Sequence, residues 1–202
     1  MVDGALGMAY GIFSTSFLLA LDLTPAIASA SVHTAEVFTT FVSGLSHFKV
    51  GNVNKELFKK LTIPGCAFAC LGTYLLVGAP IWLIKPTVSI YLGIMGMIIL
   101  LKAFNISLPM RKLDRRILAA VGGFMDAIGG GGWGAIVTSN LIANGEDPAK
   151  AIGSVNFSEF FVTLCEAITF LALLSLQHLL IILGLIIGGV IAAPIGAVVC
   201  KK

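Results

Sequence analysis

Apolar residues fill most of this chain in long runs, and short polar stretches separate the runs. Most runs approach the roughly 20 residues that a helix needs to cross a bilayer, and the first is at the short limit. None alternates in the manner of a transmembrane β-strand. The pattern predicts an all-α integral membrane protein, a single membrane domain over residues 1–202 with about seven transmembrane helices. In order, the runs cover residues 4–20, 25–47, 61–79, 87–104, 117–143, 148–174 and 178–200.

The composition agrees with this pattern. Of the 202 residues, 57% are hydrophobic and 11% are charged, and the mean hydropathy is +1.00. A soluble domain has about 45–50% apolar and about 25% charged residues. The first residues lack the basic segment of a secretory signal, so residues 4–20 are expected to stay in the protein. The lipid bilayer is therefore the expected partner, and the net charge of +3 gives no indication of nucleic acid.

Two connections are basic, around residues 49–60 and around residues 102–116. Basic loops stay in the cytoplasm. Two apolar runs separate these connections, so both are expected on the cytoplasmic side of the cell inner membrane. The turns at residues 22–25 and 145–148, and the two terminal lysines, are then expected outside. Because an outward basic tail suits a loop that leads to one more helix, the second half is expected to lack a final helix.

The two halves of the chain resemble each other at an offset of 123 positions. The offset predicts two tandem pseudo-symmetric repeats, residues 1–104 and residues 117–202. Four runs per offset would make equivalent helices parallel, related by an axis along the membrane normal. This parity argument fails if the first run is re-entrant. The matched pairs include Pro25 and Pro148, Thr15 and Thr138, Ser16 and Ser139, Gly11 and Gly134, Asp3 and Asp126, and Glu36 and Glu159.

A glycine-rich stretch lies inside the fifth run, at residues 122–134. Each glycine costs a helix about 1 kcal/mol relative to alanine, and broken backbone survives in hydrocarbon only where protein buries it or it lines a cavity. A dinucleotide fingerprint would need a preceding strand, which is missing. Close helix packing is one interpretation. The other is a broken or re-entrant first helix in each repeat, whose N–H groups face an anion. The expected substrate donors are Thr15, Ser16, Gly130, Gly131, Gly132, Thr138, Ser139 and Asn140.

Each half also carries a polar residue and a glutamate three positions apart, His33 with Glu36 and Asn156 with Glu159. This spacing places both on one helix face, two to three turns inside, where ionisable groups usually face a cavity or a partner. They form either a clasp between the repeats or the wall of a site. In the second case His33 and Asn156 contact substrate, and Glu36 and Glu159 couple a proton or ion. Glu166 shares the face of Glu159 but has no acidic equivalent in the first half.

The sequence predicts no cofactor, metal site, disulfide or catalytic set. The four cysteines, Cys66, Cys70, Cys165 and Cys200, lie in apolar runs, where free cysteine behaves as a small hydrophobic residue. No Ser/His/Asp or Cys/His set that a covalent mechanism requires occurs within either half. An intramembrane enzyme is therefore disfavoured, whereas a scaffold protein and a homo-oligomer stay open.

Residues 31–36, 43–53 and 122–134 resemble motifs of the sulfite exporter TauE/SafE family, and the resemblance covers nearly the whole chain. It implies a secondary transporter that exports sulfite, organosulfonates or related anions across the bacterial cytoplasmic membrane, and a further terminal helix in most members. With the repeat, it suggests a site at the midplane between the two halves. The alternatives are an anion channel, or an uptake carrier for thiosulfate or another small anion that is proton-coupled through Glu36 or Glu159.

Overall fold

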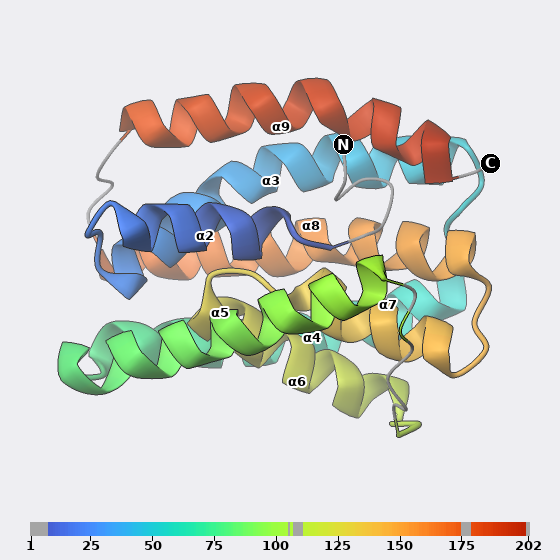
Figure 1. The fold of residues 1–202 in the computed structure, drawn as a ribbon. Helices are drawn as coiled ribbons and strands as arrows, with labels where there is room; N and C mark the ends of the chain where they lie inside the picture. The colour runs from blue at the N-terminus through green and yellow to red at the C-terminus, as the bar shows by residue number, and fades with distance from the viewer. Residues whose placement is uncertain (1–7, 105, 107–110, 175–178, 201–202) are drawn as a thin grey trace.

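The computed structural model describes residues 8–104, 106, 111–174 and 179–200, and for residues 102, 103 and 192–200 it describes the backbone only. The described residues form helices and no strand, as the sequence predicts (Figure 1). The helices are α2 (Tyr10–Ala20), α3 (Pro25–Lys49), α4 (Lys55–Gly78), α5 (Ile81–Ala103), α6 (Arg115–Gly129), α7 (Trp133–Ala143), α8 (Pro148–Leu173) and α9 (Leu179–Cys200).

Local sequence signals explain where the two central helices begin. Proline occupies the first turn of both α3 and α8. In a first turn the backbone N–H has no acceptor within the helix, so proline loses no hydrogen bond there. The Thr24 side chain accepts a hydrogen bond from the Ile27 N–H, and Asp147 accepts one from the Lys150 N–H. Each cap satisfies a backbone donor that the first turn leaves open.

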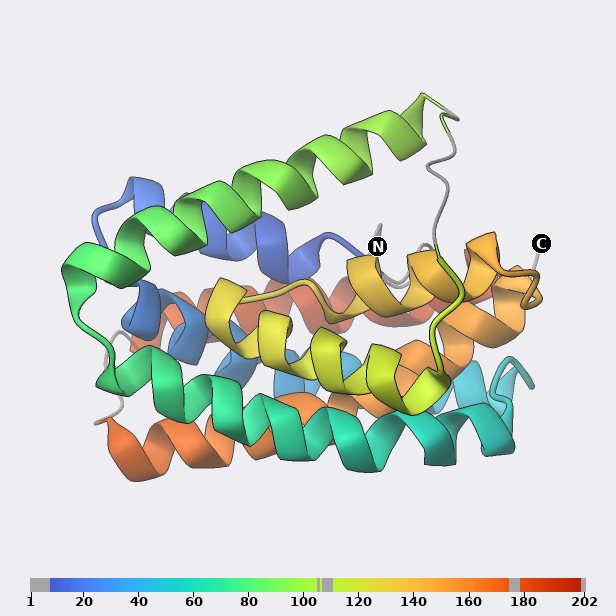
Figure 2. The same cartoon turned by 90° about the horizontal axis from the view of Figure 1, so that it is seen from below.

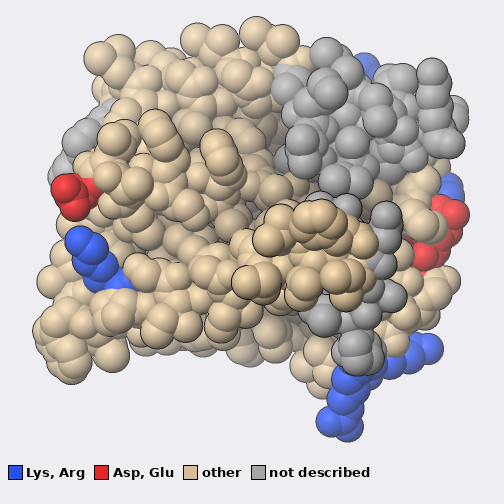
Figure 3. Space-filling model, in the orientation of Figure 1, with Lys and Arg blue, Asp and Glu red and all other residues tan. Residues whose placement is uncertain are grey.

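The surface has the polarity of a membrane protein. Among the described residues, three helical segments are long and apolar enough to cross a membrane: α4, residues 81–101 of α5, and α8. Large apolar side chains such as Trp82 and Leu180 are exposed. Figure 3 shows Lys, Arg, Asp and Glu towards the two ends of the helices, with an uncharged band between them on the described part of this face. The charge-free band fits the hydrocarbon of a bilayer.

The fifth apolar run, residues 117–143, is a re-entrant hairpin, which agrees with the expected broken or re-entrant helix and not with one full crossing. Two helices, α6 and α7, flank a break at residues 130–132, and both open ends of the hairpin lie on the right in Figure 2. There Arg115 pairs with Glu146 at 2.8 Å, and Asn140 donates a hydrogen bond to the Arg111 carbonyl. The hairpin therefore enters and leaves the bundle at the same end.

Because the hairpin does not cross the bundle, α3 and α8 run antiparallel, and the prediction of parallel repeats is wrong. The hydroxyls of Thr40 and Thr163 meet near the middle at 3.3 Å. Ser154, at the start of α8, accepts a hydrogen bond from the N–H of Asn54, just beyond the end of α3. Lys150 likewise donates to the Gly51 carbonyl. The turn at residues 145–148 thus lies at the end of the basic connection around residues 49–60, not opposite it.

Helix bounds and turn conformations recur at the offset of 123. Each bound of α7 lies 123 positions after the corresponding bound of α2. The residues before them, Ala9 and Gly132, both have positive φ, and so do Asp22 and Gly145 in the turns that follow. The division into repeats at residues 1–104 and 117–202 remains a prediction. The recurrence supports it, with the second repeat inverted relative to the first.

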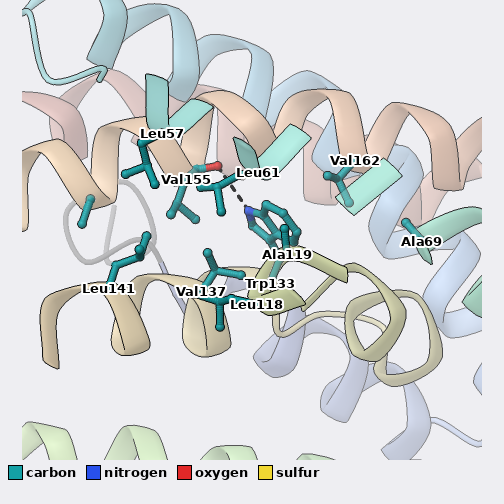
Figure 4. Packing of buried hydrophobic residues seen from close by; sticks show 11 residues of the cluster. Leu57, Leu61, Ala69, Leu118, Ala119, Trp133, Val137, Leu141, Val155 and Val162 are labelled. Carbon is teal, nitrogen blue, oxygen red and sulfur yellow. Dashed lines mark hydrogen bonds between the residues drawn. The ribbon is translucent and has the colours of Figure 1, made fainter. Parts of the chain in front are cut away.

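A tryptophan anchors the hairpin in the protein. Trp133, the first residue of α7, is fully buried among aliphatic side chains of α4, α6 and α8 (Figure 4). Its indole N–H donates to the Val155 carbonyl at 3.2 Å. A side chain on Gly65 would collide with the ring, and one on Gly122 would collide with Val137 on the same helix as Trp133, so these glycines let α4 and α6 approach α7. The cluster fixes the base from which the break projects.

Candidate functional site

The tip of the hairpin lies directly against α2. Gly130, Gly131 and Gly132 all have positive φ, a region that L-residues other than glycine rarely occupy. The Thr15 hydroxyl donates to the Gly130 carbonyl, and a side chain on Gly131 would collide with the backbone of Gly11. The predicted interruption of the helix is confirmed, and the glycine segment of the first half meets it in direct packing contact.

The polar groups of this tip bond mostly within the protein. The N–H groups of Gly130 and Gly131 reach the Asp126 carbonyl, and the Tyr91 hydroxyl donates to the Gly131 carbonyl at 3.1 Å. The Asp126 carboxylate accepts from the Trp133 N–H at 2.7 Å. A helix N-terminus attracts negative charge. In this structure that charge is supplied by Asp126, an internal carboxylate.

His33 lies beside the tip and connects three helices. Its Nδ1 is 2.9 Å from Oε2 of Glu36, on the same helix, and 3.2 Å from Oε2 of Glu166, on α8. Its Nε2 is 3.3 Å from the Asp126 carbonyl, on α6. The Phe170 ring stacks on the imidazole with centroids 6.1 Å apart. We call His33, Glu36, Asp126 and Glu166 the central cluster.

The central cluster is buried and rich in carboxylates. Its four residues are at most 4% exposed, and Glu159 is a further buried carboxylate, close enough to interact electrostatically with Glu166. No lysine or arginine is among the buried residues of the described chain. Charges that are removed from water interact strongly, so any anion that approaches the hairpin tip experiences these carboxylates.

Three members of the cluster have the spacing of a cation site. His33, Asp126 and Glu166 each offer a ligand atom, and these atoms lie within 4.8 Å of one another. Both ring nitrogens of His33, however, face oxygen acceptors. A nitrogen that donates a hydrogen has no lone pair for a metal ion. The same distances fit a hydrogen-bonding centre, and the expectation of no metal and no cofactor stays a prediction.

The structure brings some of the predicted site residues together and separates others. The hairpin tip is formed by residues 130–132, and beside it lie Thr15, His33 and Glu36. Thr138 and Ser139 are buried on α7. The remaining three lie elsewhere: Ser16 is exposed on α2, Asn140 bonds to the Arg111 carbonyl at the end of the basic connections, and Asn156 bonds to Ser43.

Asn156 does not meet its counterpart in the first half. Ser43, its partner at 2.9 Å, is ten positions after His33 on α3, which is about 15 Å along a helix. The antiparallel packing of α3 and α8 causes this separation, because residues that match at the offset of 123 then lie towards opposite ends of the bundle. The roles predicted for Ser16, Asn140 and Asn156 remain predictions, and the centre described here does not include them.

Sequence reasoning gave too little weight to Asp126 and Glu166. Asp126 matches Asp3 across the repeat, and Asp3 lies outside the described residues. Asp126 caps a helix at the break inside the bundle. Glu166 has Ser43 as its counterpart in the first half, so the repeat pattern does not mark it. Its position seven residues after Glu159, on the same helix face, was the available signal.

One cavity of about 180 Å³ opens between α3, α8 and α9, at the end where α3 begins. Its walls are mostly apolar, and Phe170 is part of its lining. The same ring stacks on His33. Phe170 therefore contacts both the cavity and the central cluster.

The chain is similar to other proteins along its whole length. The family model described as Sulfite exporter TauE/SafE matches residues 1–202. A protein of Bacillus subtilis (strain 168), "Probable membrane transporter protein YtnM", is 41% identical over 213 residues, an alignment that covers 100% of this chain and 71% of that protein. No solved structure matches the chain.

Proposed function

Because the chain belongs to the sulfite exporter TauE/SafE family, we propose that it is a secondary transporter that exports small sulfur-containing anions, sulfite or an organosulfonate, across the cytoplasmic membrane. Family membership makes the chain a multi-pass membrane transporter and not an enzyme. The substrate class, the direction of transport and the particular membrane are our proposal.

The observation that carries the proposal is the re-entrant hairpin whose glycine tip meets α2 beside the central cluster. Transporters commonly bind substrate near the midplane, between repeats, where interrupted helices direct their N-termini at anionic groups. We place the substrate at this junction, near Thr15 and residues 130–132. An anion that binds at the start of α7 displaces the Asp126 carboxylate, which now caps the Trp133 N–H.

The electrical driving force favours export. An inside-negative potential drives an anion outwards by about 2.3 kcal/mol per charge per 100 mV. Export therefore needs no second ion as its energy source, whereas uptake of the same anion would require one. The basic connections around residues 49–60 and 102–116 are expected at the cytoplasmic end, where they raise the local concentration of anions.

Counterflow of radiolabelled sulfite in proteoliposomes tests the proposal. We expect saturable exchange that unlabelled sulfite on the opposite side accelerates. Replacing Thr15 by Val removes a donor at the junction and should lower exchange about fivefold, which corresponds to about 1 kcal/mol for one hydrogen bond. Thr87→Val is the matched control, because Thr87 is exposed on α5 and its hydroxyl donates to the Leu83 carbonyl of the same helix.

The outcomes separate the candidate functions. Unsaturable flux with single-channel currents would indicate a channel. Accumulation against an electrochemical gradient would indicate coupled uptake. Absence of flux for sulfite, a sulfonate and thiosulfate would refute the proposed substrate class.

A further inference from the structure

We infer that His33, Glu36 and Glu166 form a buried proton-binding site that couples one proton to anion movement. The inference rests on the proposed anion transport and deepens it. It assigns a role to Glu166, which the repeat pattern leaves without an equivalent, and it makes His33 a proton carrier.

The count of hydrogens at the His33 ring gives the first argument. Nε2 faces the Asp126 carbonyl, which only accepts, so Nε2 carries a hydrogen. Nδ1 faces carboxylate oxygens of Glu36 and Glu166 at 2.9 and 3.2 Å. Ionised carboxylates also only accept. A bare Nδ1 would place its lone pair against theirs, so a second proton lies in this contact, either on Nδ1 or on one carboxyl group.

The environment of Glu166 gives the second argument. Its side chain is fully buried, and neither carboxylate oxygen accepts a hydrogen bond from the described residues. Its close contact is the ion-pair distance to His33. An ionised carboxylate is costly to bury without a partner. The shared proton is therefore what makes this position of Glu166 tolerable.

The groups that face the site are acidic or neutral, so this proton is the main positive charge in the described centre. Glu36 comes from α3, Asp126 from α6, Glu159 from α8, and Cys70 from α4. Tyr91, from α5, interacts electrostatically with Asp126 and Glu166. Nothing basic other than His33 and His47 is buried in the described chain. An anion at the hairpin tip is repelled by the deprotonated cluster and tolerated by the protonated one, so the two ligands bind together.

The second half of the protein holds a neutral version of the same contact. Moved by 123 positions, His33 becomes Asn156 and Glu166 becomes Ser43. Ser43 and Asn156 are joined by a hydrogen bond of 2.9 Å, as Glu166 and His33 are joined at 3.2 Å. Neither serine nor asparagine titrates in the physiological range. Among the described residues the contact between histidine and glutamate therefore occurs once, which corresponds to one proton per transported anion.

Infrared difference spectra of the whole chain in lipid nanodiscs, acidic minus alkaline, detect the proton without any substrate. We expect a buried carboxyl or imidazolium band in the wild type that shifts in D2O. Glu166→Gln and His33→Asn should each remove it, and the latter installs the residue of the other half. Glu56→Gln is the matched control, because Glu56 is exposed on α4. Identical spectra for wild type, Glu166→Gln and His33→Asn would overturn the inference.

Sulfite distribution in proteoliposomes tests the coupling. At zero membrane potential, a gradient of about one pH unit should sustain an approximately tenfold sulfite ratio beyond that of protein-free liposomes. Glu166→Gln should lose this ratio, whereas Glu56→Gln should keep it. If the wild type exchanges sulfite but the pH gradient leaves its sulfite ratio unchanged, the inference is overturned and the proposed function stays intact. Absence of sulfite exchange would refute the substrate, and the infrared spectra would still decide the proton site.

Discussion

Replacing Gly131 by alanine is the sharpest test of the hairpin tip. Gly131 has a φ of 134°, a conformation that costs a residue with a Cβ about 1–3 kcal/mol. A Cβ at this position would lie 2.5 Å from Gly11 Cα and 2.6 Å from Ile12 N. These are backbone atoms of α2 and cannot rotate away. Overpacking of this kind costs about 1–3 kcal/mol more, so the total is about 2–6 kcal/mol.

Gly51→Ala is the matched control, because it has the strain without the collision. Gly51 has a φ of 80° and no atom within 4 Å of a Cβ. Relative to this control, Gly131→Ala should lose about 2 kcal/mol from the collision alone, which for a chain of this length lowers Tm by about 4–8 °C. Thermal unfolding in detergent measures both variants. If Gly131→Ala melts at or above the temperature of Gly51→Ala, the close approach of the hairpin tip to α2 is refuted.

Two further predictions concern the cap of α7 and the direction of the chain. Asp126→Ala leaves the Trp133 N–H without its acceptor and should cost about 1–3 kcal/mol, whereas Asp126→Asn keeps an oxygen there and should melt closer to the wild type; equal melting of the two would refute the cap. Single cysteines at Lys59 and Glu146, in a chain without its native cysteines, should react with an impermeant maleimide from one side of the membrane and a cysteine at Asp22 from the other. Labelling of Glu146 together with Asp22 would refute the re-entrant hairpin.

Short-range features of the fold could be predicted from the sequence. Residues 25–47 and 148–174 were expected as helices, and the observed helices begin at Pro25 and Pro148, because proline in the first turn and a capping side chain before it act within a few residues. His33 and Glu36 were paired for the same reason, since a spacing of three places them on one face. Their contact at 2.9 Å follows from the helix alone.

The direction of the second half depends on contacts that no local pattern contains. A run of 27 apolar residues satisfies the length of one crossing, and two half-helices that turn back satisfy the same composition. The pair between Arg115 and Glu146 distinguishes the two, but it joins residues at opposite ends of the run. Treating residues 117–143 as one full crossing reverses the predicted direction of α8. This one error accounts for the prediction of parallel repeats and for the prediction that the turn at residues 145–148 lies outside.

The same error explains why the central cluster was only partly predicted. Parallel repeats would place equivalent residues at the same depth in the membrane. A site built from residues that match at the offset of 123 is then the expected one. The antiparallel arrangement instead joins His33 to Glu166 and Asn156 to Ser43. In neither pair are the two residues related by the offset of 123. The search for matching residues therefore selected Asn156 and passed over Glu166.

A physical reason favours keeping only one of these two contacts ionisable. Each charge taken out of water costs several kcal/mol, and its partner repays this only in good geometry. A second His–Glu contact in place of Asn156 and Ser43 would add another buried carboxylate to a bundle that already holds Glu36, Asp126 and Glu159. The neutral hydrogen bond provides the same link between α3 and α8 without that charge. The contact between Asn156 and Ser43 thus serves packing, whereas the contact between His33 and Glu166 carries the proton.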